Sequence, residues 1–175
     1  MRSGFLDFVM PIITSLGNGG VIWIAIALIF TATKKYRTAG IAVLAALILN
    51  LLIGNVILKP LIARVRPCDI NTAVQLLIKR PTDYSFPSGH TLSSFAAATV
   101  IFCRDKRLGI AAVILASLIA FSRLYLYVHY PTDILGGILI GIPIGIFSYY
   151  ITVKIVKIMR NRTEKPARTD ESQIK

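Results

Sequence analysis

The sequence predicts an all-α integral membrane protein, a helical bundle of about five transmembrane helices preceded by an N-terminal interfacial helix. Three observations predict this fold class. The chain is 55% hydrophobic with a mean hydropathy of +0.69, which is high for a soluble domain. Its apolar residues gather in runs that approach the roughly 20 residues needed to cross a bilayer. Its 20 Lys and Arg, against 8 Asp and Glu, lie mostly between those runs.

The N-terminal stretch "GFLDFVMPIITSLG" is typical of a helix that lies in the membrane interface. Asp7 and Pro11 interrupt it, so it does not indicate a cleavable signal peptide. At helical spacing its apolar residues share one face: Phe5, Phe8, Val9, Ile12 and Ile13.

Five apolar segments follow as candidate spans, with a sixth if the N-terminal helix inserts fully. They cover residues 16–33, 39–58, 87–103, 108–127 and 132–156. The segment 68–86 is too polar to cross and is interrupted by Pro81, so we expect a loop there. Its stretch "AVQLLIK" (73–79) is expected to form a short helix on the membrane surface.

Charge divides the connections between the spans into two groups. One group holds 13 of the 20 Lys and Arg: three in "KKYR" (34–37), three in "RDKR" (104–107) and seven from Lys154 onward. Basic residues in short loops favour the cytoplasmic side. The sequence therefore predicts a multi-pass plasma membrane protein with residues 1–156 embedded. Residues 157–175 are expected to form a basic, disordered cytoplasmic tail.

This charge distribution also bears on the partners of the protein. Nucleic-acid binding needs basic residues on a soluble surface and is not expected here. Membrane lipids are the expected surroundings, and no obligate protein partner is indicated.

Cys68 and Cys103 fall at opposite ends of the spans, whereas a disulfide needs Cα atoms within about 7 Å. We therefore expect two free thiols.

Polar residues return to the outer ends of the spans in three clusters. These are "KPLIARVRP" (59–67), "PSGH" (87–90) and "SRLYLYVHYPTD" (122–133). One charged residue at a membrane end often only snorkels toward water. Three clusters that converge on one face and include both histidines of the chain indicate a functional site instead.

In the first cluster, Lys59 and Arg66 are separated by seven residues, nearly two helical turns. Both side chains point the same way if the helix continues past Pro60, where a kink is also possible. Arg64 falls on another face at this spacing, and we expect it to meet lipid headgroups.

In the second cluster, Ser88, Gly89 and His90 open a predicted helix. Unpaired N–H groups and the positive end of the helix dipole favour an anion there. Gly89 allows a close approach and Ser88 can donate its hydroxyl, although a plain serine N-cap is the alternative. A bound phosphate would favour protonated His90, which could then act as an acid.

In the third cluster, His129 precedes a helix that Pro131 can start, and Asp133 follows four residues later. Asp133 can cap this helix, accept Nδ1–H of His129, or do both; the second role leaves Nε2 as a nucleophile. Arg123 adds a planar fork that matches phosphate oxygens. These groups suit metal-independent phosphoryl transfer, since only Asp133 is a clear candidate for a metal-ligating carboxylate.

At these residues the sequence resembles the type 2 phosphatidic acid phosphatase superfamily, which shares its site with vanadium haloperoxidases and glucose-6-phosphatase. The pattern K-x6-RP, PSGH, SR-x5-H-x3-D is matched in order at every position. The resemblance implies that His129 attacks phosphorus to form a phosphohistidine, oriented by Asp133, while His90 protonates the leaving oxygen. It implies no cofactor. It also implies that five residues hold the phosphoryl oxygens: Lys59, Arg66, Ser88, Gly89 and Arg123.

Lipid phosphates are the expected substrates, because no loop is polar enough to build a pocket for a sugar phosphate. The small size and outward site resemble bacterial enzymes that convert undecaprenyl pyrophosphate to undecaprenyl phosphate. Phosphatidylglycerophosphate, phosphatidic acid and diacylglycerol pyrophosphate are alternatives, with headgroup selection expected in the loop 68–86. A catalytically idle lipid-binding scaffold is the second alternative. Longer members of the family carry a further N-terminal span, where this chain is expected to have only the interfacial helix.

Overall fold

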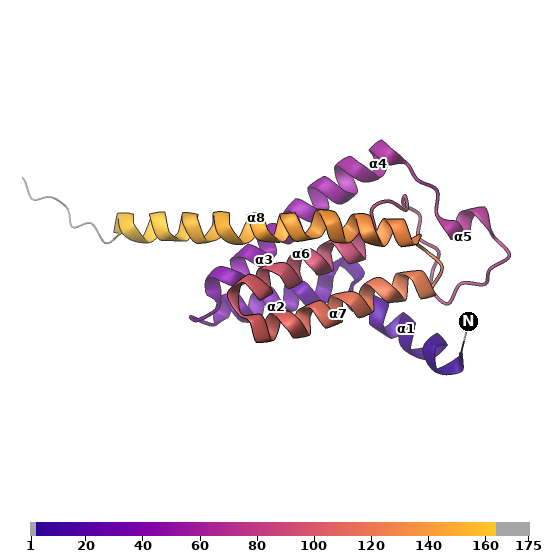
Figure 1. The fold of residues 1–175 in the computed structure, drawn as a ribbon, viewed down its shortest axis with the longest axis horizontal. Helices are drawn as coiled ribbons and strands as arrows, with labels where there is room; N and C mark the ends of the chain where they lie inside the picture. The colour runs from indigo at the N-terminus through magenta and orange to yellow at the C-terminus, as the bar shows by residue number, and fades with distance from the viewer. Residues whose placement is uncertain (1–2, 164–175) are drawn as a thin grey trace, which may run out of the picture.

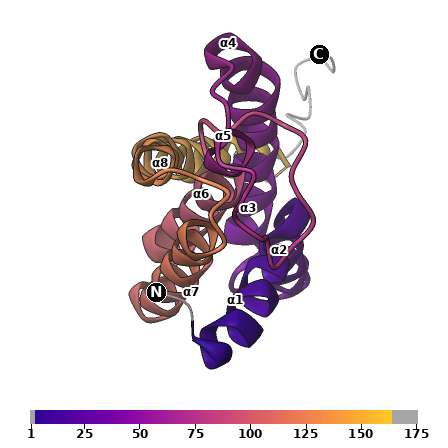
Figure 2. The same cartoon turned by 90° about the vertical axis from the view of Figure 1, so that its right-hand side faces the viewer.

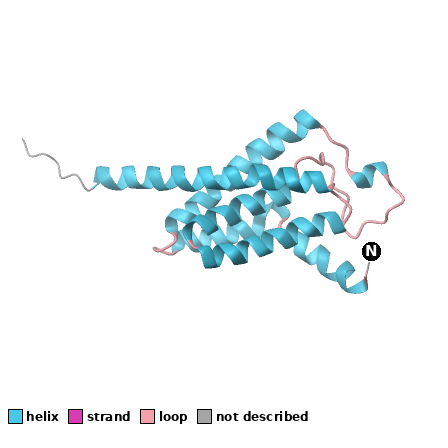
Figure 3. Ribbon diagram, viewed as in Figure 1, coloured by secondary structure: helices cyan, strands magenta, loops and turns pink. Residues whose placement is uncertain are grey.

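The structure is a computed structural model that describes residues 3–163, and every regular element in that range is a helix (Figure 3). This confirms the all-α prediction. The elements are α1 (Gly4–Leu16), a short 3-10 helix (Asn18–Gly20), α2 (Val21–Ala32), α3 (Arg37–Asn50), a π-helix (Leu51–Leu58), α4 (Lys59–Ile62), α5 (Pro67–Ile70), α6 (Gly89–Arg104), α7 (Lys106–Tyr125) and α8 (Pro131–Thr163).

Three helical segments of the described chain are long and apolar enough to cross a membrane: Arg37–Ile70, Lys106–Tyr125 and Pro131–Arg162. The pair α1 and α2, bent by 46°, makes a fourth if it forms one span. The first predicted span, 16–33, thus begins at a break between two helices. The chain is a multi-pass membrane protein, and the count of five spans stays a prediction.

Helix α6 lies among α7, α8 and α3 (Figure 2) and supplies much of the buried core. Its contact with α8 is close because glycines of α8 face the α6 backbone. A Cβ at Gly141 would lie 2.7 Å from the carbonyl oxygen of Leu92, and one at Gly145 would lie 2.5 Å from that of Ala96. Small residues allow helices to approach in this way. The packing fixes the first turn of α6 beside the first turn of α8.

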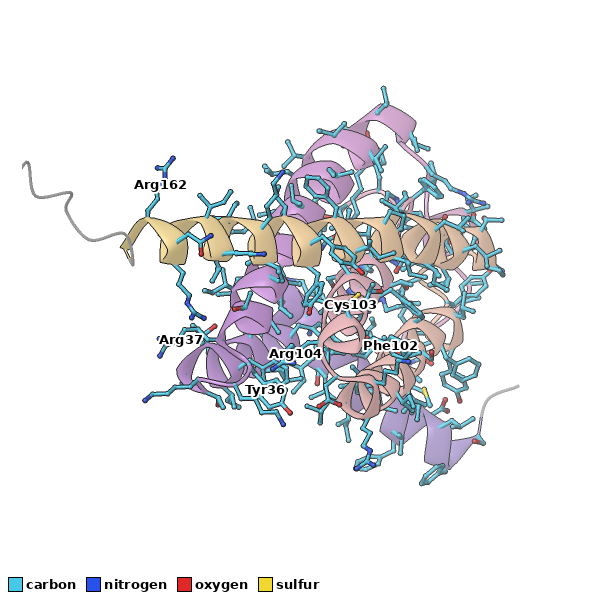
Figure 4. The ribbon with its side chains drawn as sticks, turned by 60° about the vertical axis from the view of Figure 1, so that its left-hand side comes forward. Tyr36, Arg37, Phe102, Cys103, Arg104 and Arg162 are labelled. Carbon is cyan, nitrogen blue, oxygen red and sulfur yellow. The ribbon has the colours of Figure 1, made fainter. Side chains whose placement is uncertain are left out.

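The connections from α2 to α3 and from α6 to α7, which carry two of the basic clusters, lie at the same end of the bundle (Figure 1). At one end the basic connections meet: Arg104 donates to the carbonyl oxygen of Lys35 at 2.7 Å, and Tyr36 donates to the Asp105 carboxylate at 3.1 Å (Figure 4). The other end holds α4, α5, the long loop to α6 and the connection from α7 to α8 (Figure 1). All three polar clusters are therefore at this second end.

At the polar end the structure corrects one local prediction and decides one point that the sequence left open. Residues 73–79 are not helical; the short helix is instead α5, which begins at Pro67, as suits a residue without a donor N–H. The helix that contains Lys59 does not continue to Arg66. It ends at Ile62, and Ala63 adopts a left-handed conformation with φ +48°.

Other predictions concern the ends of the chain and the thiols. On the predicted apolar face of α1, Phe5, Phe8 and Ile12 are exposed, whereas Val9 and Ile13 pack against the buried core. The interfacial position of α1 stays a prediction. Helix α8 runs through Thr163, so the predicted tail boundary at residue 157 falls inside it. Residues 164–175 of the predicted tail lie outside the described residues. Both cysteines are free, as predicted.

Candidate active site

Lys59 and Arg66 converge on one carboxylate, that of Asp83 in the loop before α6. Lys59 forms an ion pair with Oδ2 of Asp83, and Arg66 Nη2 donates to Oδ1 at 2.8 Å. Arg66 also donates through Nε to the carbonyl oxygen of Asp83 at 2.8 Å. Both cations are buried. The predicted pair does come together, but through a loop and a left-handed residue rather than along one helix.

Asp83 occupies the position that an anionic ligand of these cations would take. Burial by itself raises the pKa of Asp83, but the hydrogen bond and charge of Lys59, together with Arg66, outweigh it and lower the pKa to about 2. The carboxylate is therefore charged at any working pH. A phosphate that binds Lys59 and Arg66 must compete with it.

An Asp83→Asn substitution is therefore expected to tighten the binding of vanadate, a phosphate analogue. Asp83 is half exposed, and ion pairs of this kind contribute up to about 1 kcal/mol, which corresponds to a two- to fivefold change. Inhibition by vanadate measures the effect. Asp69→Asn is the matched control, because Asp69 also pairs with an arginine, Arg80, at 3.0 Å. Weaker vanadate binding in Asp83→Asn would show instead that Asp83 positions the cations.

His129 lies in the connection between α7 and α8, held between Arg66 and Asp133. Arg66 Nη1 is 3.0 Å from Nε2 of His129, and Nδ1 is 3.3 Å from Oδ2 of Asp133. Because a guanidinium group can only donate, Nε2 must carry the lone pair. Nδ1 then carries the proton that Asp133 accepts. This is the tautomer that a nucleophilic Nε2 requires.

The surroundings of His129 keep its ring neutral. Burial lowers the pKa of His129; the hydrogen bond to Asp133 opposes this, and the charges of Arg66 and Arg123 add to the lowering, giving a pKa of about 4. The lone pair on Nε2 is thus present at neutral pH.

Asp133 performs both of the tasks that the sequence left open. Its Oδ2 accepts from the backbone N–H of Tyr130 at 2.9 Å, which caps α8, and it also faces Nδ1 of His129. The hydroxyl of Ser85 donates to the same oxygen at 2.5 Å. Asp133 is fully buried. Ser85 lies outside the three polar clusters of the sequence.

The first turn of α6 lies beside Lys59. Ser88 is the N-cap, and its hydroxyl oxygen accepts from the hydroxyl of Thr91 at 3.0 Å. Its backbone N–H donates to the carbonyl oxygen of Asp133 at 3.2 Å. A Cβ at Gly89 would lie 3.9 Å from Nζ of Lys59. Ser88 therefore caps α6, and the same Cβ at Gly89 would lie 3.3 Å from Oδ1 of Asn55. Contact of Ser88 and Gly89 with a phosphate stays a prediction.

Arg123 reaches the site from the last turn of α7. Its Nη1 donates to the hydroxyl of Thr14 on α1 at 2.7 Å, while its Nε is buried and has no hydrogen-bond partner among the described residues. A buried donor without a partner is costly. An anion bound beside Arg123 would satisfy it.

The N-terminal segment contributes residues that the sequence analysis missed. The side-chain oxygen of Asn18 is 2.9 Å from Nε2 of His90. A Cβ at Gly17 would lie 2.6 Å from the His90 ring, so only glycine permits this approach. The stretch "LGNGG" places a polar residue between glycines inside an apolar segment. This feature of the sequence could have indicated that Asn18 contacts the site.

One sequence prediction about this end of the molecule is wrong. Arg64 was expected to point toward lipid headgroups. Its Nη1 instead donates to Oδ1 of Asp133 at 2.8 Å and to the hydroxyl of Thr132 at 2.6 Å. The left-handed Ala63 ends the helix and turns the chain back toward α8, so helical spacing no longer applies to Arg64.

A cavity of about 1040 Å³ joins these groups to apolar side chains of α2, α3 and the π-helix, of which Ile24, Ile48 and Leu51 are exposed on the outside of the bundle. Its polar end is lined by Lys59, Arg66, Asp83, His90, Arg123 and His129, and its apolar end by Ile24, Leu44, Leu47, Ile48 and Leu51. The arrangement can hold an anion against Nε2 of His129 with a hydrocarbon chain attached.

Comparison with known proteins shows the family and agrees with the fold. The model of the PAP2 superfamily matches residues 38–157. The undecaprenyl-diphosphatase BcrC of Bacillus subtilis (strain 168) is 32% identical, over 98% of this chain and 92% of that protein. The undecaprenyl-diphosphatase of Sulfolobus acidocaldarius is 34% identical over 74% of this chain, and the match spans 63% of that protein. A crystal structure of a transmembrane PAP2 type phosphatidylglycerolphosphate phosphatase from Bacillus subtilis has a TM-score of 0.70 and 29% identity, covering 89% of this chain and 80% of that one.

Fold and cavity thus define the class, a helical membrane protein with buried cationic and histidine side chains around a cavity at one end of its bundle. The chain belongs to the PAP2 superfamily, as a member of its lipid phosphatase family. Thr14 and Asn18 lie outside the matched residues 38–157, although both contact the site.

Proposed function

We propose that this protein hydrolyses undecaprenyl pyrophosphate to undecaprenyl phosphate and inorganic phosphate, without a metal, through a phosphohistidine at His129. One observation carries the proposal. Nε2 of His129 has its lone pair at the cationic end of a cavity whose other end is apolar. That cavity suits a substrate with a charged head and a hydrocarbon tail, and the nucleophile lies at the head.

In the first step, Nε2 of His129 attacks the terminal phosphorus and the bond from phosphorus to the bridging oxygen breaks. His90 gives its proton to that oxygen, and undecaprenyl phosphate leaves. Lys59, Arg66 and Arg123 stabilise the charge that develops on the transferred group. In the second step, water attacks the phosphohistidine, its proton passes to His90, and the P–N bond breaks to release phosphate.

The choice of substrate is supported by the two relatives named as undecaprenyl-diphosphatases. The solved phosphatidylglycerolphosphate phosphatase supports the alternative, a glycerolipid phosphate with the same chemistry. Both readings use the same residues.

The proposed orientation places the site on the outer face of the plasma membrane and the end of α8 in the cytoplasm. The charge pattern supports it, because the connections 34–37 and 104–107 meet at the end of the bundle away from the site (Figure 4). Basic loops favour the cytoplasmic side.

The test is phosphate release by the purified protein in detergent with EDTA present. Undecaprenyl pyrophosphate, phosphatidic acid and phosphatidylglycerophosphate are compared at equal mole fraction in the micelle. The proposal predicts the highest kcat/KM for undecaprenyl pyrophosphate and no loss of activity in EDTA. A preference for a glycerolipid would replace the substrate and keep the mechanism. No release from any lipid by folded protein would favour an idle scaffold.

A further inference from the structure

Arg64 lies outside the sequence pattern that marks the site, yet it binds the carboxylate behind the proposed nucleophile. Its Nη1 is 2.8 Å from Oδ1 of Asp133 and 2.6 Å from the hydroxyl of Thr132. Its guanidinium carbon lies 4.1 Å from the centroid of the Tyr130 ring. The carbonyl oxygen of Arg64 also accepts from the N–H of Ser85 at 2.8 Å. Side chain and backbone are thus both fixed.

The two oxygens of Asp133 have different donors. Oδ2 accepts hydrogen bonds from the hydroxyl of Ser85, the N–H of Tyr130 and Nδ1 of His129. Oδ1 accepts a hydrogen bond from Arg64. Asp133 is fully buried, while the Arg64 side chain is 35% exposed. Arg64 therefore holds the carboxylate from the outer side, opposite to His129.

We propose that Arg64 is a positioning residue, which holds Asp133 in the orientation that keeps His129 aligned for attack. This inference rests on the proposed function, since it matters to turnover only if His129 is the nucleophile. Neither Arg64 nor Asp133 is among the described residues that line the cavity. Arg64 acts through Asp133, so its loss should affect kcat and leave KM nearly unchanged.

The charge of Arg64 gives a second readout. It faces Asp133 and offsets part of the negative charge that His129 experiences. The other ionisable groups around His129 are Arg66 before α5, Arg123 on α7, Asp133 on α8 and His90 on α6. Without Arg64, Asp133 stabilises the protonated ring more strongly. The acid limb of the kcat/KM profile, set by a His129 pKa of about 4, then moves to higher pH.

The experiment compares Arg64→Gln, Arg64→Lys and wild type in detergent. For Arg64→Gln we expect kcat to fall about 10- to 100-fold, the range for a misplaced reacting group, with KM within twofold and the acid limb at higher pH. Lysine keeps the charge but lacks the planar fork. Arg64→Lys should therefore keep the wild-type acid limb and recover part of kcat.

The matched control is Arg104→Gln at the opposite end of the bundle. Arg104 also lies over a tyrosine ring, that of Tyr36 at 5.3 Å, and donates to a backbone carbonyl at 2.7 Å (Figure 4). The Arg104→Gln variant should keep the wild-type kcat.

A double-mutant cycle with Asp133→Asn then separates positioning from a general structural effect. Arg64→Gln should cause little further loss of kcat when Asp133 is already asparagine.

Several outcomes would overturn the inference. These are a wild-type kcat in Arg64→Gln, a loss confined to KM, or full additivity in the cycle. If Arg64→Gln does not fold, the cycle is run with Arg64→Lys and judged by the same criterion. Failure of the proposed function would give a different result, because His129→Ala would then remain active. An inactive His129→Ala beside a fully active Arg64→Gln would refute this inference alone.

Discussion

A His129→Ala variant is expected to lose at least about 10⁴-fold in kcat, the scale seen when a nucleophile is removed. Nε2 of His129 is the atom with a lone pair at the cationic end of the cavity, and alanine offers nothing to accept the phosphoryl group. Phosphate release from undecaprenyl pyrophosphate measures the loss, and wild-type turnover would end the assignment.

The control for this variant is binding of vanadate, measured by protection against thermal unfolding. Lys59, Arg66 and Arg123 remain in place in His129→Ala, so an anion should still stabilise the folded protein. An inactive variant that is protected by vanadate has lost the nucleophile. If neither activity nor protection remains, the cations themselves have moved, and His129→Gln replaces alanine in the test.

The second large effect is expected for His90→Ala. General acid catalysis contributes typically about 10²- to 10⁴-fold, and the contribution depends on how much the leaving oxygen needs a proton. An alkyl oxygen, as in phosphatidic acid, is a poor leaving group. The bridging oxygen of a pyrophosphate leaves more readily, and a nitrophenyl oxygen is a better leaving group still. The loss of kcat should therefore be largest for phosphatidic acid and smallest for nitrophenyl phosphate.

An equal loss for all three substrates would contradict the acid role and leave His90 as a structural or binding residue. Asn18→Ala provides a related comparison, because Asn18 contacts Nε2 of His90 at 2.9 Å. If Asn18 positions His90 as the acid, the losses of kcat in Asn18→Ala should follow the same order of substrates as those in His90→Ala. Each loss should be smaller than the corresponding loss in His90→Ala.

Much of the site could be predicted because its residues occur at helix ends with recognisable roles. Ser88 caps α6, so the sequence could place the PSGH turn at the start of that helix. Pro131 begins α8, so the sequence could also place the H-x3-D part of the third motif at a helix start. Hydrophobic runs placed α6, α7 and the first part of α8 to within a few residues. These predictions depend on local chemistry, which a sequence displays.

The parts that could not be predicted depend on contacts between distant segments. Arg64 reaches Asp133 because Ala63 is left-handed, and an alanine gives no local sign of that conformation. Asp83 pairs with Lys59 across 24 residues of sequence. Asn18 meets His90 across 72 residues, outside the region that the family pattern covers. Helical periodicity carries no information on such contacts.

The most direct test of the proposed mechanism is to trap the phosphoenzyme. Wild-type protein is mixed with undecaprenyl pyrophosphate labelled in the terminal phosphate and quenched in alkali, because phosphohistidine is labile in acid. Peptides are then mapped by mass spectrometry. The mechanism predicts label on His129, absent from His129→Ala and absent when vanadate is added first. Turnover without label on His129 at any quench time, or label on another residue, would contradict it.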